Sequence, residues 1–258
     1  MDTEKIKVRV SDFVSLIIQN DAAAFGFIKV NGEPNINAFL NKLIPNLLFM
    51  RKYRRSEIHD TIGEAMEFHG DVITQEHIRS YIDTVIDKVY FSDSDLDRLN
   101  SFFWIRPNRN TKAIFDEIAE SETAITGLDT STCIRSLLNE YSHFPQYKRE
   151  SITFMPEYDD IDISYRTDRI LHLRYEGKKY RVVVMETVYG FLFDQHNYII
   201  CYDIKANTLN SFYLSGISDT YVVEKKHPIS EKLIHVFQKY LDEEMFRDHK
   251  LYPIEESV

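Results

Sequence analysis

The stretch from Lys5 to Val10 reads KIKVRV and alternates strictly between basic and β-branched residues. Successive side chains of a β-strand point to opposite faces, so this period of two predicts a strand with one apolar face and one basic face. The cations of the basic face are Lys5, Lys7 and Arg9.

Two helices are expected directly after this strand. Ser11 or Asp12 can cap the first helix. The residues that recur in it at helical spacing are Phe13, Leu16, Ile17 and Asn20. After the turn-rich residues 31–34, a second amphipathic helix has Asn35 or Asn37 as its cap. Its apolar face comprises Ile36, Phe39, Leu40, Leu43 and Ile44. Pro45 should end or kink this helix, because proline lacks a backbone N–H.

The opening pattern then returns further along the chain. After two more expected helices, over about 56–69 and 74–86, residues 88–93 read KVYFSD where residues 7–12 read KVRVSD. Residues 133–138 repeat the apolar spacing of residues 39–44, with Asp129 in the place of Asn35. One interpretation is a second strand-helix-helix unit over residues 87–142, whose strand at 88–91 pairs with residues 5–10. The other is a chance likeness, in which case the first strand pairs with its copy in another chain.

From about Ser151 the sequence has the character of β structure. Short alternating or β-rich runs with polar breaks between them are typical of a small barrel or sandwich. The runs are Ile161–Tyr165, Ile170–Tyr175, Tyr180–Met185, Phe191–Phe193, Tyr198–Ile204, Leu209–Leu214 and Tyr221–Val223. A final helix is expected from Ser230 to about Met245. The predicted fold class is therefore α+β, with a helical half at 1–50 and 51–150 and a β domain at 151–258.

Composition excludes several classes of protein. The 258 residues are 43% hydrophobic and 28% charged, which is typical of a folded chain of one large or two small domains and not of a disordered one. No apolar run approaches the roughly 18 residues of a membrane span, and the first ten residues lack the apolar core of a signal peptide. Two distant cysteines, Cys133 and Cys201, provide no disulfide framework. We therefore expect a cytoplasmic protein without a membrane partner.

The charge is unevenly distributed. The whole chain has a net charge of −10, yet residues 1–55 carry nine Lys or Arg against five acids, a net of +4. A polyanion would therefore approach the amino-terminal end.

Motifs for catalysis are absent. The chain has no GxGxxG, GxxxxGK[ST], HExxH, GxSxG or CxxC motif, so no cofactor, metal site or catalytic residue is expected. Residues 93–97 begin like a calcium loop but lack its Gly and Glu, and acids in the first turn of a helix explain them better. Asp159, Asp160 and Asp162 could form the metal site of a nuclease. A solvated loop and strand edge is the alternative we favour.

The order strand-helix-helix over residues 4–48 resembles the ribbon-helix-helix family of nucleic-acid-binding modules. In that resemblance an antiparallel ribbon presents Lys5, Lys7 and Arg9 to nucleic acid, and the helix start near Asn35 and Asn37 donates backbone N–H groups to a phosphate. The alternative is an edge strand protected from aggregation by its lysines.

A second resemblance is carried by residues 170–175 (ILHLRY), 180–184 (YRVVV), 197–203 (NYIICYD) and 212–217 (FYLSGI). These runs resemble a WYL domain, a small Sm/SH3-like β-barrel that serves bacterial regulators as a ligand or nucleic-acid sensor. The triplet that names the family is Asn197-Tyr198-Ile199 here, so only the Tyr is kept. Where the family usually has arginines around its later Phe, this chain has Asn210, Tyr213 and Gly216.

These departures put the usual anionic-ligand pocket in doubt. A substitute basic patch would come from Arg166, Arg169, Arg174, Lys178, Lys179 and Arg181. Of these, Arg174, Lys179 and Arg181 are candidate nucleic-acid contacts, together with Tyr198 as an aromatic that could stack on an unpaired base. For the basic residues the alternative is an ordinary charged face of the barrel. For Tyr198 the alternative is a place in the barrel core.

The two resemblances together are similar to bacterial WYL transcription regulators and to the WYL accessory proteins of type VI-D CRISPR systems. The first implies DNA binding. The second implies binding of single-stranded RNA and stimulation of an RNA-guided ribonuclease, the CRISPR effector. Both imply a non-enzymatic regulatory protein, and we expect a homodimer. A metal-dependent nuclease and a pure protein-interaction module are the competing classes.

Overall fold

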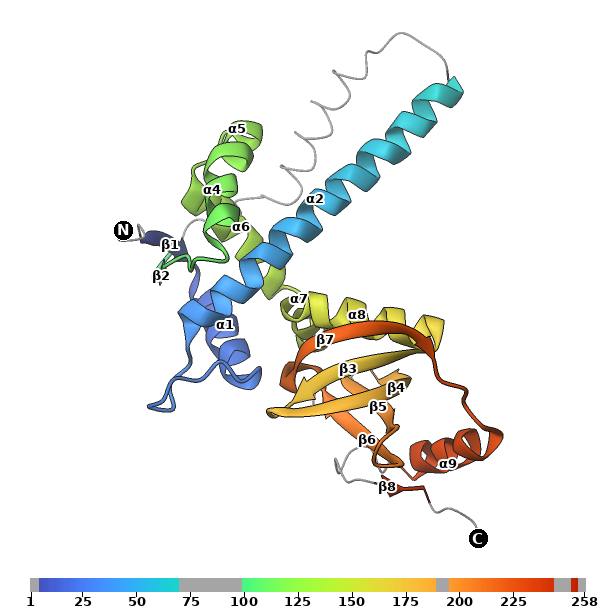
Figure 1. Ribbon diagram of the computed structural model, residues 1–258. Helices are drawn as coiled ribbons and strands as arrows, with labels where there is room; N and C mark the ends of the chain where they lie inside the picture. The colour runs from blue at the N-terminus through green and yellow to red at the C-terminus, as the bar shows by residue number, and fades with distance from the viewer. Residues whose placement is uncertain (1–4, 70–98, 189–194, 244–251, 255–258) are drawn as a thin grey trace. The chain divides into compact units, whose positions relative to one another are not determined.

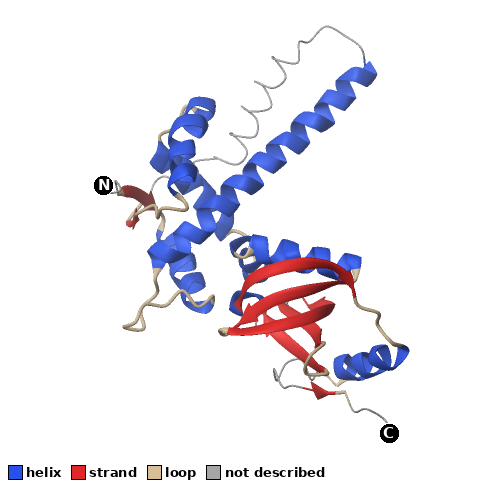
Figure 2. Ribbon diagram, in the orientation of Figure 1, coloured by secondary structure: helices blue, strands red, loops and turns tan. Residues whose placement is uncertain are grey.

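The computed structural model describes residues 5–69, 99–188, 195–243 and 252–254. The chain forms two compact units, Met1–Phe144 and Pro145–Val258, which are described separately below (Figure 1). The first unit is mainly helical, and the second combines helices with a six-stranded antiparallel sheet (Figure 2). The predicted α+β class is confirmed. No helix in the described part of the chain is long and apolar enough to cross a membrane.

A two-stranded antiparallel ribbon opens the first unit. Strand β1 (Ile6–Val10) pairs with β2 (Ser101–Ile105), in a register that sets Lys7 opposite Trp104 and Arg9 opposite Phe102. The apolar side chains of one face are buried: Val8, Val10, Phe103 and Ile105. The predicted strand and its two faces are thus present, but the partner strand is not the predicted one. Residues 88–91 lie outside the described residues, and β1 pairs with a segment ten residues beyond them.

Helix α1 (Asp12–Ala24) begins as expected at Ser11, whose Oγ accepts a hydrogen bond of 3.3 Å from the N–H of Val14. The residues noted at helical spacing in the sequence do not form its buried face. Val14, Ile18 and Ala22 are buried, whereas Phe13 and Leu16 are exposed. The buried residues recur four apart on one face of the helix, and α1 packs on β2 and on α6 (Thr130–Ser142).

Pro45 was expected to end or kink its helix; helix α2 (Ile36–His69) runs through it, so the first of these two alternatives is wrong. A proline inside a helix costs about 3 kcal/mol through the lost hydrogen bond and a clash with the preceding turn. Burial on both sides of Pro45 offsets that cost, since the flanking apolar residues are almost fully enclosed. These are Leu43, Ile44, Leu47 and Leu48. The two helices expected over 36–44 and 56–69 are therefore one.

The second half of this unit repeats part of the first. After β2 come α4 (Lys112–Glu117), a π-helical turn (Ile118–Glu122), α5 (Thr123–Thr126) and α6. Asp129 caps α6 by accepting a 2.8 Å bond from the N–H of Thr132, as Asn35 accepts 3.2 Å from Ala38 at the start of α2. The predicted match between residues 133–138 and 39–44 holds for burial on both helices. The helix expected from Thr74 lies outside the described residues.

The second unit begins with two helices, α7 (Gln146–Thr153) and α8 (Met155–Thr167). The strand predicted at Ile161–Tyr165 is wrong, because these residues form the last turns of α8. Ile161 and Ser164 are its buried residues, three apart on one helical face, and Asp168 ends the helix in the left-handed conformation at φ 53°. The apparent alternation was therefore the edge of an amphipathic helix.

The six strands of this unit include four that follow predicted runs closely, one that is longer than the predicted run Tyr221–Val223, and a short last one that was not predicted. They are β3 (Arg169–Tyr175), β4 (Lys178–Val188), β5 (Tyr198–Asp203), β6 (Thr208–Tyr213), β7 (Ile217–Lys226) and the short β8 (Tyr252–Pro253). Their order is β7-β3-β4-β5-β6-β8, antiparallel throughout. Among the described strands β7 and β8 stand at opposite ends and do not pair, so closure into a barrel remains a prediction. The run Phe191–Phe193 lies outside the described residues.

Helices cover both faces of this sheet (Figure 2). Helix α8 packs on β3, β4 and β7. The terminal helix α9 (Glu231–Asp242), capped by Ser230, packs Leu233 and Tyr240 against the other face. The strand residues in that cluster are Val183, Met185, Tyr198, Ile200 and Leu209. The predicted final helix is confirmed as far as Asp242.

Candidate nucleic-acid interface

The outer face of the β1–β2 ribbon brings cations and aromatic rings together. Lys7 and Arg9 are exposed on β1, and Phe102 and Trp104 are 50% and 52% exposed on β2. The Nζ atom of Lys7 lies 4.4 Å from the centre of the Phe102 ring and 5.6 Å from that of Trp104. The two rings meet edge to face, with centroids 6.3 Å apart. We call the outer side chains Lys7, Arg9, Phe102 and Trp104 the ribbon face.

The aromatic half of the ribbon face was missed at the level of sequence. Residues 102–105 read FFWI, an unbroken apolar run that gives no sign of which residues face outward. The signal lies in the pairing with β1. Once Val8 lies opposite Phe103, the period of two places Phe102 and Trp104 on the same face as Lys7 and Arg9. Lys5, exposed just before β1, extends the row of cations.

Asn35 and Asn37 hold the start of α2 in place beside the ribbon. The Asn35 side chain caps the helix at Ala38, and the Oδ1 atom of Asn37 accepts a 2.8 Å hydrogen bond from the backbone N–H of Arg106. On the other half of the unit, the Ser131 hydroxyl donates 2.9 Å to the backbone oxygen of Lys7. Asn35 therefore acts within α2, whereas the bonds of Asn37 and Ser131 fix the ribbon segment against α2 and α6.

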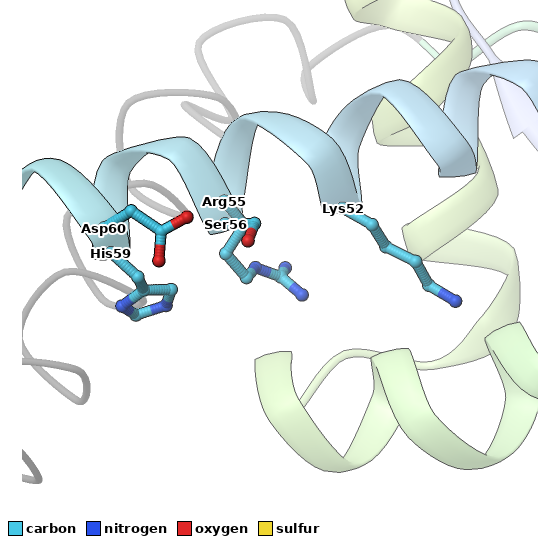
Figure 3. A pocket seen from close by; sticks show the side chains of 5 residues that line it. All are labelled: Lys52, Arg55, Ser56, His59 and Asp60. Carbon is cyan, nitrogen blue, oxygen red and sulfur yellow. The ribbon is translucent and has the colours of Figure 1, made fainter.

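The basic run at residues 51–55 is largely neutralised inside the first unit. Arg55 pairs with Glu122 at 3.2 Å in a site where the side chains are 10% and 2% exposed. Lys52 pairs with Glu117, and Arg54 pairs with Glu140. Lys52 and Arg55 also line one side of α2 with Ser56, His59 and Asp60 (Figure 3). Much of the positive charge counted over residues 1–55 is therefore not available to a polyanion. The main exposed positive charge of these residues lies on the ribbon face.

A second group of cations lies on the sheet of the second unit. In the pairing of β3 with β4, His172 is opposite Arg181 and Arg174 is opposite Lys179, so these side chains share one face. Tyr221 of β7 is opposite His172 on the other side, and the two rings stack with centroids 4.6 Å apart. We call this group the sheet face. The structure thus brings Arg174, Lys179 and Arg181 together, and adds the stacked pair that sequence reasoning missed.

Burial and the cations of the sheet face lower the pKa of nearby histidines, and one of these cations is partly neutralised by an aspartate. Burial lowers the pKa of His172, and the nearby Arg181 guanidinium lowers it further. The same guanidinium acts on His227, whose pKa is lowered first by burial and then by Arg181 and Lys225. Arg174 is partly neutralised, since its Nε atom lies 2.9 Å from a carboxylate oxygen of Asp219.

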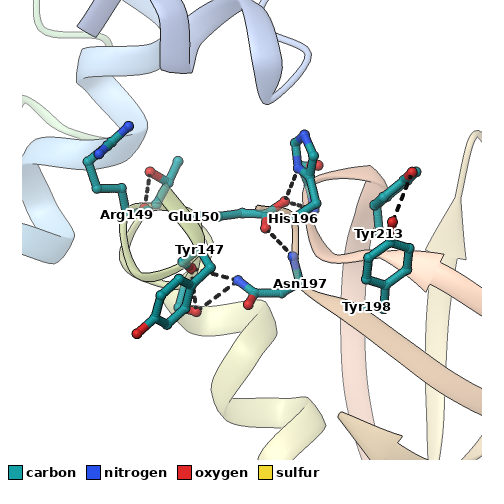
Figure 4. A network of polar contacts seen from close by, with 10 residues as sticks. Tyr147, Arg149, Glu150, His196, Asn197, Tyr198 and Tyr213 are labelled. Carbon is teal, nitrogen blue, oxygen red and sulfur yellow. Dashed lines mark hydrogen bonds and ion pairs between the residues drawn. The ribbon is translucent and has the colours of Figure 1, made fainter. Parts of the chain in front are cut away.

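Tyr198 is placed in the core and not on a binding surface. Its side chain is only 3% exposed, and its hydroxyl donates 3.3 Å to that of Tyr213. The preceding Asn197 holds α7 against the sheet, because its amide group donates 2.7 Å to the backbone oxygen of Tyr147. Its backbone N–H donates 2.6 Å to the buried Glu150 carboxylate (Figure 4). The triplet at 197–199 therefore has a structural role here.

The three aspartates considered for a nuclease lie on α8 and not in a loop. Thr220 donates 2.6 Å to Asp160, and Asp162 forms an ion pair of 2.8 Å with Arg166. Burial raises the pKa of Asp159, and the charges of Asp162 and Asp160 raise it further. No group of three or more possible metal ligands occurs within the described ranges of the chain.

Comparisons with known proteins agree with the fold. No family model matches the chain, and a search of curated proteins finds no match. Among solved structures, the chain is similar to "Crystal structure of a CRISPR Cas-related protein", with a TM-score of 0.64 and 15% identity over 93% of this chain and 71% of that one. It also aligns with the proteasome accessory factor B/C (PafBC) of Arthrobacter aurescens, at 13% identity over 86% of this chain and 35% of that one. That TM-score, 0.26, does not indicate a shared overall fold.

Proposed function

We propose that this chain is a non-enzymatic, nucleic-acid-binding regulatory protein and that the ribbon face is its main binding surface. The observation that carries this proposal is the pairing of two strands with different chemistry. Strand β1 exposes Lys7 and Arg9, and β2 exposes Phe102 and Trp104 beside them. Neither pair is needed for the core, since the opposite face of the ribbon is the buried one.

The ribbon face suits a single strand better than a duplex. Ammonium and guanidinium groups contact phosphates of either form and release counterions. Exposed aromatic rings add affinity only where a base offers its flat face, and in a duplex the neighbouring base pairs already cover that face. Stacking on an aromatic side chain contributes about 1–3 kcal/mol per base. We therefore infer that unpaired RNA or DNA lies across the ribbon with its phosphates along β1 and its bases over β2.

The sheet face is proposed as a weaker second contact. Arg174, Lys179 and Arg181 supply the charge, and the Tyr221 ring, 56% exposed, supplies a stacking surface. Its charge is lower than the sequence suggested, because Asp219 pairs with Arg174. The order of affinity is therefore ribbon face first and sheet face second.

The process that this protein regulates is proposed from its fold. A solved structure that shares this fold is of a CRISPR Cas-related protein, and the resemblance noted in the sequence implies an accessory role beside an RNA-guided ribonuclease. Binding of single-stranded RNA fits that role. A transcription regulator that reads duplex DNA is the second candidate, and it is favoured only if the ribbon enters a major groove.

Trp104 allows a direct test, because it is the only tryptophan in the chain and lies on the ribbon face. Intrinsic fluorescence of the full-length protein is followed while single-stranded RNA, single-stranded DNA or duplex DNA of equal length is added at one salt concentration. We expect strong quenching by the single strands at low concentrations and little by the duplex. Quenching by the duplex alone would favour the transcription regulator, and no change with any of them would remove the ribbon face from the proposal.

The two competing classes give different results in simple assays. A nuclease would cleave labelled RNA or DNA in the presence of magnesium, and replacement of Asp159 by Asn would abolish the cleavage. A pure protein-interaction module would leave Trp104 fluorescence unchanged by nucleic acid and would bind a protein partner without strong dependence on salt. Neither outcome is expected from the ribbon face.

A further inference from the structure

The two aromatic rings of the ribbon face stand almost at right angles to each other. The Phe102 and Trp104 rings have an interplanar angle of 85°, with centroids 6.3 Å apart. Phe103, the residue between them, is buried on the opposite face of the ribbon, and each outer ring is about half exposed. The two rings project from one strand with its period of two, so they are held by the ladder with β1. Each ring is therefore a separate stacking surface with its own orientation.

A single strand with continuously stacked bases does not fit two such surfaces at once. Bases in a continuous stack lie parallel to each other and about 3.4 Å apart. Two neighbouring bases that each lie flat on one of these rings are instead turned by nearly the angle between the rings. Binding to both rings therefore breaks one contact between neighbouring bases and forms two contacts between a base and a ring.

The register of β1 with β2 supplies one cation for each ring. Lys7 is directly opposite Trp104, and Arg9 is directly opposite Phe102. The two pairs are separated by two residues, which is about 7 Å along the strands. A phosphate at each cation and a base on each ring account for two consecutive nucleotides of an extended strand. The ribbon face thus has the composition of a site for two nucleotides.

Resting on the proposed function, we propose that the ribbon face holds two adjacent nucleotides with their bases turned apart and thereby selects pyrimidine-rich single strands. Aromatic side chains stack on every kind of base, so the rings themselves discriminate little. The cost that differs between strands is the broken contact between neighbouring bases. This cost is smaller for pyrimidines, because the larger purine rings overlap more with each other. Preferences for pyrimidine runs arise in this way from stacking strength and backbone flexibility.

The test compares labelled oligouridine and oligoadenosine of about ten nucleotides, a length within the usual site size of single-strand-binding proteins. Fluorescence anisotropy measures the affinity of the full-length protein for each strand at one salt concentration. Both strands carry the same phosphates, so the electrostatic contribution cancels in the ratio of the two affinities. We expect oligouridine to bind at least about fivefold more tightly, because one stacked step is easier to break in it.

Phe102→Leu tests whether the angle between the rings causes this preference. With one ring left, a strand can keep its continuous stack on Trp104, so the ratio should fall to about one while both strands bind more weakly. Trp104→Leu should have the same effect, and both changes leave the buried face of the ribbon as it is. The matched control is Arg9→Gln, which removes a charge and leaves both rings in place. It should weaken the binding of both strands and keep the ratio.

Three results would overturn the proposal: equal or tighter binding of oligoadenosine, a ratio that survives in both leucine variants, or a ratio that Arg9→Gln abolishes. Each of them leaves the ribbon face as a binding surface and removes only its selectivity. Binding of neither strand would remove the proposed function itself and this inference with it. The two failures are therefore seen separately.

Discussion

The ammonium group of Lys7 lies 4.4 Å from the centre of the Phe102 ring, across the antiparallel pair of β1 and β2. A cation over an aromatic face at an exposed site contributes about 0.5–1 kcal/mol. The contact keeps the long lysine side chain above the ribbon and leaves the outer part of the ring accessible. The two strands therefore supply a charge and a stacking platform at one place, and their contributions can be measured separately.

Replacement of both Lys7 and Arg9 by Gln should reduce the salt dependence of single-strand binding. Each phosphate contact contributes about 0.7–0.9 to the slope of log affinity against log salt. Loss of two contacts should therefore flatten the slope by about 1.4–1.8. Fluorescence anisotropy with a labelled single strand at several salt concentrations measures it.

Replacement of Phe102 and Trp104 by Leu should weaken single-strand binding without changing its salt dependence. The affinity should fall about 5- to 150-fold, as expected for a stacked base that contributes about 1–3 kcal/mol, while the salt slope stays the same. Equal effects of the charge variant and the aromatic variant on the slope would contradict the division of labour between β1 and β2.

The basic strand was predictable because its signal is local. KIKVRV alternates in charge and hydropathy, and the cap at Ser11 follows at once. The partner strand was not, because FFWI carries no alternation of its own and its outward residues are fixed only by the register with β1. Residues 88–91 offered a closer match of sequence pattern. Which strand pairs with β1 depends on where the intervening chain leads, and a pattern of six residues carries no information about that path.

In the helices, too, a local sequence signal was overridden by contacts that the sequence pattern does not show. Pro45 is a strong local signal for a break, yet Leu43, Ile44, Leu47 and Leu48 are buried on either side of it, and tertiary packing prevails over propensity. For the sheet face, the spacing of Arg174, Lys179 and Arg181 was visible in the sequence. The stacking of His172 on Tyr221 joins residues about fifty apart, and only the register of β3 with β7 brings it about.

The buried ion pair of Arg55 and Glu122 should be important for the stability of the first unit. The carboxylate of Glu122 is 2% exposed, so removal of its charge leaves Arg55 without its main counter-charge in a poorly hydrated place. Glu122→Gln should lower the free energy of unfolding by about 3 kcal/mol, as for other broken buried pairs. Chemical denaturation of the full-length protein measures the change.

The control for that variant is the exposed pair of Lys112 and Asp116, at 2.6 Å with both side chains more than half exposed. Asp116→Asn removes the same kind of charge where water replaces it, and should change stability by less than about 0.5 kcal/mol. Similar losses from Glu122→Gln and Asp116→Asn would contradict the assigned role of burial.

Glu150 should be equally important in the second unit. Its fully buried carboxylate accepts 2.6 Å from the N–H of Asn197, 3.2 Å from that of Ser215 and 3.0 Å from the ring of His196. Glu150→Gln sets an amide NH₂ against groups that are themselves donors, so a buried bond is lost. We expect a loss of about 2–3 kcal/mol in the free energy of unfolding, measured by denaturation.

Glu224→Gln, an exposed change on β7, is the comparison for Glu150→Gln and should be close to neutral. The amide resonances of Asn197 and Ser215 should move in the Glu150 variant, since they lose a charged acceptor. Unmoved resonances with a large loss of stability would mean that the cost arises elsewhere.

The oligomeric state should be independent of the ribbon. The homodimer expected from family resemblance remains a prediction, but β1 already has its partner strand in the same chain, so exchange of strands between chains is not required. The full-length protein should sediment as a dimer, and the Phe102 and Trp104 variants should sediment with the same mass. A wild-type monomer would remove the homodimer, and a dimer lost only in those variants would place the interface on the ribbon face.

The two cysteines should be unreactive in the folded protein. Cys133 and Cys201 are both buried, and burial raises the pKa of each thiol, which keeps the reactive thiolate scarce. A disulfide reagent at pH 8 should modify both at least a hundredfold faster in denaturant than in buffer.

The raised pKa values of the two thiols also make the free energy of unfolding dependent on pH. The unfolded thiols ionise near pH 8.5 while the folded ones stay protonated, so the unfolded state holds fewer protons and the free energy of unfolding should fall as the pH rises above that value. Cys201→Ala should lessen this fall, and a Cys201→Ala variant with the full wild-type decline would assign it to other groups.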